Sequence, residues 1–155
     1  MLQVIQASLA TIESSHKTTV LVLDNPDILL ALTLASAQQL NTFLLTLRSV
    51  AHSTILVCAA DSPLLSAQHT PLETASAAFV TQQAHNSRFV VSVRELETGA
   101  AKDVSGMLRV TRGGAAYDEC ESEENFEDVR EMEALYLVQR DGQAKVFERG
   151  ATGLG

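Results

Sequence analysis

Two short apolar runs constrain the fold of this chain more than any other feature. They are Thr19–Asp24 (TVLVLD) and Thr54–Ala60 (TILVCAA). A strand that is apolar on both faces must be covered on both faces, which is typical of parallel sheets flanked by helices. A third strand is predicted at Phe89–Leu96. Helix signals lie between these strands, so the N-terminal half is expected to alternate helix and strand.

Helices are predicted from apolar residues at helical spacing and from residue types that begin a helix. Met1–Ser15 repeats apolar residues at helical spacing, and Asn25-Pro26 puts a proline where a first turn tolerates it. Ser36–Gln39 matches a capping box. Thr70–Glu73 combines a threonine cap, a proline and a glutamate three residues after the cap, which predicts a helix to about Asn86.

One uncharged stretch, Ile28–Leu47, is long enough to resemble a membrane span. Gln38, Gln39 and Asn41 lie in its middle, and Ser36 can cap a helix there. Two short buried helices are therefore expected instead of a lipid-facing one, and no membrane partner is expected.

The C-terminal third has a different pattern. Gly106–Thr111 alternates, and Asp141-Gly142 is a hairpin signal between Leu135–Gln139 and Ala144–Phe147. The predicted fold class is α/β, with a mostly parallel sheet flanked by helices and antiparallel C-terminal hairpins. The 155 residues are predicted to form a single domain.

The charge of the chain is concentrated in one place. The net charge is −8, and Asp118–Glu133 alone holds nine acids and one base. The remainder is neutral, so the acidity does not exclude an anionic partner elsewhere. Residues 117–133 are predicted to form an acidic loop. Two cysteines, Cys58 and Cys120, exclude a disulfide scaffold and a four-cysteine zinc site within the chain.

Motifs of phosphate-binding enzymes are missing, with one partial exception. The chain has no G-x-x-x-x-G-K-[ST] loop and no G-x-S-x-G elbow, and its four histidines are scattered. Asp24 follows an apolar strand, as a Walker B carboxylate does where it holds Mg²⁺. Because the chain has no phosphate loop, the favoured interpretation is that Asp24 caps the next helix or pairs locally. No cofactor, metal site or catalytic residue is predicted.

Basic residues gather between Arg88 and Arg112. Of these, Arg94, Lys102, Arg109 and Arg112 are the candidates for contact with phosphates or with a neighbouring subunit. Arg109 alternates with apolar neighbours on a predicted strand. The competing interpretation is that Lys102-Asp103 and Arg112 only fix the turn and the sheet.

Residues His69–Gly114 resemble the Elongator complex protein 6 family. The most specific part is Leu96–Gly106 (LETGAAKDVSG), followed by Leu108, Val110 and Arg112-Gly113-Gly114. The similarity extends from about Thr19 to Phe147. Members of that family have more chain before the first helix and strand, including a first core strand, so the sequence is expected to be a truncated or divergent form.

The resemblance implies a RecA-like domain without a phosphate loop and without catalysis. It implies a hetero-hexameric ring with Elongator proteins 4 and 5, attached to the catalytic Elongator subcomplex. It further implies binding of transfer RNA during wobble-uridine modification, in the cytoplasm and nucleus. Two alternatives stay open: a nucleoside-triphosphatase that uses Asp24, and a structural ring adaptor that touches no RNA.

Overall fold

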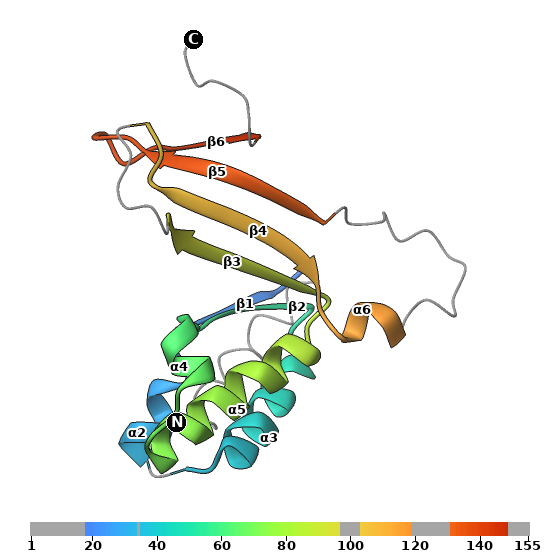
Figure 1. Ribbon diagram of the computed structural model, residues 1–155. Helices are drawn as coiled ribbons and strands as arrows, with labels where there is room; N and C mark the ends of the chain where they lie inside the picture. Colours follow the sequence, from blue (N-terminus) through green and yellow to red (C-terminus); the bar gives the residue numbers. More distant parts are fainter. Residues whose placement is uncertain (1–17, 34, 97–102, 119–130, 149–155) are drawn as a thin grey trace. The chain divides into compact units, whose positions relative to one another are not determined.

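The computed structural model describes residues 18–33, 35–96, 103–118 and 131–148 (Figure 1). The chain divides into two compact units, the first ending at Gln83 and the second beginning at Ala84. The expected helix at Met1–Ser15, the site residue Lys102 and most of the acidic segment 117–133 lie outside the described residues.

The first unit is a helix-covered parallel strand pair. Its elements are β1 (Val20–Asp24), α2 (Ile28–Thr33), α3 (Ala37–Arg48), β2 (Ser53–Val57), α4 (Ser62–Ser66) and α5 (Pro71–His85), the last of which ends just inside the second unit. β1 and β2 pair in parallel, from Val20 opposite Ser53 to Asp24 opposite Val57. A parallel pair needs a crossover connection, and α2 with α3 supplies it.

Capping residues define where the two long helices of this unit begin. The Ser36 hydroxyl accepts a hydrogen bond from the Gln39 N–H, and the Gln39 side chain accepts one from the Ser36 N–H. At α5, Glu73 accepts bonds from the backbone of His69 and Thr70. Both predicted start signals are confirmed, because each depends only on residues three or four apart.

The core of the first unit lies between β1–β2 and the helices. Leu30, Leu40, Leu44 and Phe79 are buried there, and Leu23 and Leu56 pack against them from the two strands. Figure 1 shows α2, α3 and α5 on the same side of β1 and β2. Burial of side chains of this size contributes about 1.5–3 kcal/mol each.

A partly buried polar ladder, in which Asn41 and Gln83 are the buried members, joins α3 to α5. The Asn41 amide donates to Gln82 and accepts from Gln83, and the Arg48 guanidinium donates to Gln83 Oε1 at 2.8 Å. Desolvation lowers the pKa of Arg48. Because an unpaired buried amide costs about 1–3 kcal/mol, this ladder favours one relative position of the two helices.

The second unit is an antiparallel sheet of four strands in chain order. They are β3 (Phe89–Glu95), β4 (Gly106–Arg112), β5 (Met132–Val138) and β6 (Ala144–Glu148), with the short helix α6 (Ala115–Asp118) after β4. In register, Ser92 lies opposite Arg109, which lies opposite Glu133, and Leu135 lies opposite Phe147.

The predicted hairpin between β5 and β6 is confirmed. Gln139 N–H donates to Gln143 O at 2.8 Å, and Gly142 N–H donates to Gln139 O at 3.0 Å. Gly142 has φ +84°. The hairpin loop thus has three residues, with the glycine in the left-handed region that such loops require.

The mixed α/β class is confirmed, whereas the expected dominance of parallel pairing is not. Of the four strand pairings in the described ranges, β1–β2 is parallel and the other three are antiparallel. β3 pairs antiparallel with β4. Ser92 and Arg94 give β3 a polar face, so it is not the doubly apolar strand that parallel sheets use.

The uncharged stretch Ile28–Leu47 forms two separate helices, as expected. Within the described ranges, no helix combines the length and apolar character needed to cross a membrane.

Candidate functional site

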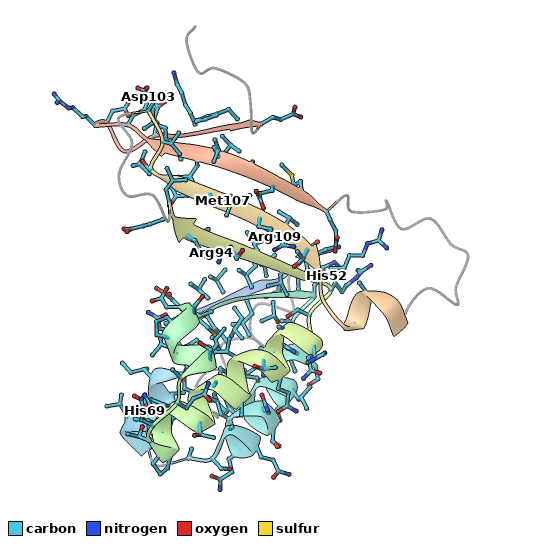
Figure 2. All side chains as sticks on the ribbon, in the orientation of Figure 1. His52, His69, Arg94, Asp103, Met107 and Arg109 are labelled. Carbon is cyan, nitrogen blue, oxygen red and sulfur yellow. The ribbon has the colours of Figure 1, made fainter. Side chains whose placement is uncertain are left out.

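Two of the predicted basic residues share one face of the four-stranded sheet. Arg94 lies opposite Met107, and Arg109 lies opposite Ser92. Directly opposed residues of an antiparallel pair point to the same face, so Arg94 and Arg109 are diagonal neighbours, with Cα atoms about 7–8 Å apart. Both side chains are exposed. Figure 2 labels the two arginines on adjacent strands, together with Met107.

Strand alternation and register identify the other members of this face. We call it the basic face; its polar members are Ser92, Arg94, Arg109, Thr111, Glu133 and Lys145. Three cations and one acid stand on these strand positions, so the face is positive although the chain is acidic. Glu133 lies opposite Arg109 and reduces the charge at that end.

The exposed guanidinium groups of Arg94 and Arg109 can each bind an anionic group. Each presents a planar set of N–H donors that can hold a phosphate or a carboxylate by two hydrogen bonds. Ser92 and Thr111 add hydroxyls to the same face. The arrangement suits a ligand that carries anionic oxygens in series better than one that carries a single charge.

Arg112 does not belong to the basic face. It lies opposite Phe89, on the other face, and its backbone N–H donates to Glu131 Oε1 at 3.1 Å. The two glycines that follow it lie tight against the turn between α5 and β3: Gly113 N–H donates to Arg88 O at 2.8 Å, and an added Cβ on Gly113 would overlap the carbonyl of Ser87. Gly113 and Gly114 therefore allow the backbone after β4 to lie close to this turn.

Asp24 occupies the carboxyl end of β1, as the sequence predicts for a Walker B-like residue. It is exposed, and within the described ranges its carboxylate neither caps α2 nor forms an ion pair. Asn25 follows with φ +47° and donates its N–H to Val57 O at 2.9 Å. Asn tolerates this left-handed conformation better than most residues.

Sequence reasoning overlooked Asp27, which lies in the same turn. Its Oδ1 is buried without a hydrogen-bond partner in the described structure. Burial, and secondarily the charge of Asp27, raise the pKa of the half-buried Cys58 to about 11. The sequence Asp24-Asn25-Pro26-Asp27 has an acid on each side of the turn, so Asp27 could have been found from the sequence. No group of three acids, histidines or cysteines with metal-binding geometry occurs in the described ranges.

Comparison with protein-family models and with curated proteins found no match for this chain.

Proposed function

We propose that this chain is a non-catalytic subunit of Elongator, whose basic face contacts transfer RNA while another subunit modifies the wobble uridine. The proposal rests on the resemblance of His69–Gly114 to the Elongator complex protein 6 family. The structural observation that supports it is the shared, exposed position of Arg94 and Arg109. Elongator proteins 4 and 5 are the proposed partners, in a hetero-hexameric ring, and the cytoplasm and nucleus are the proposed locations.

A RecA-like domain is part of the same proposal. A parallel strand pair with an α-helical crossover, followed by antiparallel strands, is compatible with that architecture. The sequence has no phosphate loop to cradle a nucleotide. The fold would then serve for the surfaces that it offers to neighbours.

The test is to co-express the chain with Elongator proteins 4 and 5, measure the mass of the assembly, and titrate it with transfer RNA. Replacement of Arg94 and Arg109 by alanine is expected to weaken RNA binding at least tenfold. It should also lower the slope of log affinity against log salt by about two, one for each phosphate contact. Arg140→Ala, at the exposed β5–β6 turn, is the control for loss of positive charge. It should change the affinity for RNA by less than about twofold and the salt slope by no more than a few tenths.

A structural adaptor that touches no RNA is the second candidate function, because part of the motif that carries the resemblance, Gly113 and Gly114, is used for close packing within the second unit. It predicts that the double variant assembles and binds RNA with unchanged affinity and salt slope. Loss of assembly in the double variant, with Arg140→Ala intact, would instead place the two arginines at a subunit contact.

The nucleoside-triphosphatase alternative depends on the exposed carboxylate of Asp24. It predicts micromolar binding of Mg-ATP to the isolated chain by calorimetry, abolished by Asp24→Asn. We expect no such binding, since the chain lacks the loop that would hold the phosphates.

A further inference from the structure

The basic face also carries a continuous row of apolar side chains. Arg94 lies opposite Met107 (Figure 2), Met107 lies opposite Leu135, and Leu135 lies opposite Phe147. One apolar residue from each of β4, β5 and β6 therefore stands in line with Arg94, and we call these three residues the apolar row. Each of them is partly exposed. Phe147 is the one aromatic residue on the described strand positions of this face.

Cations stand at both ends of the apolar row. Arg94 and Arg109 lie at the β3–β4 side. Lys145 lies on β6, two residues before Phe147 and on the same face, roughly 15 Å from either arginine by ordinary strand spacing. All three cations are exposed, and within the described ranges none of their side chains forms a hydrogen bond or an ion pair. The acid on this face, Glu133, stands at the end away from Lys145.

We propose that the apolar row stacks the bases of an unpaired RNA segment whose phosphates lie on Arg94, Arg109 and Lys145. The inference rests on the proposed function and specifies the form of RNA that the basic face takes. In a duplex the bases are paired inside, and the outer surface offers phosphates and hydroxyls that an apolar row cannot bind. In an unpaired segment the bases turn away from the backbone and stack on aromatic side chains, while cations hold the phosphates.

The members of the apolar row differ in what they contribute. The ring of Phe147 supplies the flat surface on which a base stacks, and the polarizable thioether of Met107 suits contact with a second aromatic ring system. Leu135 joins the two across β5. The span between Lys145 and the arginines exceeds that of a single nucleotide, so the ligand is a short strand. Because every base has an apolar face, binding of this kind depends little on sequence.

The test is to titrate the purified full chain with an unpaired, fluorescently labelled RNA of about ten nucleotides, and with an abasic strand of the same length. The abasic strand keeps the phosphates and lacks the bases, so it should bind at least fivefold more weakly. Phe147→Leu keeps apolar volume but removes the ring, and should weaken binding of the unmodified strand at least fivefold while leaving the abasic strand within about twofold. Phe89→Leu, which removes a ring from the opposite face of the same sheet, is the matched control and should leave both affinities within about twofold.

Two further variants separate the stacking contact from the phosphate contact and from misfolding. Phe147→Tyr retains an aromatic ring and should bind the unmodified strand within about twofold of the unchanged chain. Lys145→Gln should lower the slope of log affinity against log salt by about 0.7 for both strands, the value for one phosphate of a single strand. Arg140→Gln is its control and should leave the slope unchanged. Circular dichroism spectra of all variants report whether they fold.

Three results would overturn the proposal: equal affinity of the unchanged chain for the unmodified and abasic strands, equal losses from Phe147→Leu and Phe89→Leu, or tighter binding of a hairpin duplex than of the unpaired strand. The first and third need no variant, so they decide the question even where Phe147→Leu does not fold. If Arg94→Ala with Arg109→Ala still weakens RNA binding in any of these cases, the proposed function stands and only the stacking of unpaired bases is wrong. Failure of the chain and of its assembly to bind any of these strands would contradict both.

Discussion

At the scale of single residues, Cys58 makes the clearest chemical prediction. Its thiol is half buried beside the core, and its pKa of about 11 stands above the ordinary value of 9.0. At pH 8 the thiolate fraction should be roughly a hundredfold lower than that of a free cysteine, and the thiolate is the reactive form. In a Cys120→Ser background, alkylation by iodoacetamide should be correspondingly slow and should accelerate up to about pH 11.

Asp27→Asn should speed this alkylation, because the negative charge of Asp27 contributes to the raised pKa of Cys58. Asp61→Asn removes a charge just before α4 and serves as the control. A wild-type rate at pH 8 equal to that of a free thiol would show that Cys58 is neither desolvated nor near Asp27.

The sequence predicts which residues are candidates for binding better than it predicts which of them lie together. Arg94, Arg109 and Asp24 are exposed, as a binding role requires, but only the β3–β4 register shows that Arg94 and Arg109 share a face. Register depends on pairing across the connector between the strands, which local sequence does not encode. Arg112 was grouped with them by proximity in sequence, although alternation places it on the opposite face.

At the scale of elements, the start of α5 depends on Glu73. Its carboxylate accepts hydrogen bonds from the N–H groups of His69 at 2.7 Å and Thr70 at 2.8 Å, which hold its pKa below the usual range. The folded state therefore favours the ionised carboxylate. This contribution is present above the ordinary pKa, near 4.5, and is lost as the pH falls through the lower folded value.

Glu73→Gln should accordingly destabilise the chain at pH 7 and have a smaller effect at pH 3. Urea unfolding at the two pH values, followed by circular dichroism, measures the difference. Glu95→Gln, an exposed carboxylate at the end of β3, is the control. A Glu73→Gln effect of equal size at both pH values would contradict a role for its charge.

Element starts were predictable where a local rule governs them. The caps at Ser36 and Thr70 and the glycine turn at Gly142 need only residues a few positions apart. The start signals described above do not include one for α4, although Asp61, Ser62 and Pro63 follow directly after the predicted strand Thr54–Ala60. Those residue types suit a helix start as well as a strand end, and only the early end of β2 at Val57 decides between them.

At the scale of the whole molecule, buried apolar side chains are unevenly distributed. Among the described residues, the buried hydrophobic set is Leu30, Leu40, Leu44, Leu47 and Phe79 in the first unit, and Ala134 alone in the second. The fully buried apolar side chains of the described residues therefore lie almost entirely in the first unit.

Two phenylalanines in contrasting surroundings test this distribution. Phe79 on α5 is 0% exposed within the core of the first unit, whereas Phe89, the first residue of β3, is 41% exposed. Phe79→Ala should lower the free energy of unfolding by about 3–5 kcal/mol, through lost transfer energy and a cavity. Phe89→Ala should lower this free energy by about 1 kcal/mol or less, since its ring is already partly hydrated.

Urea unfolding, followed by circular dichroism, measures the free energy of unfolding of both variants and of the unchanged chain. The two losses should differ by at least twofold, because only the Phe79 ring is fully removed from water in the folded chain. Equal losses for the two variants would mean that the core of this molecule is not confined to its first unit.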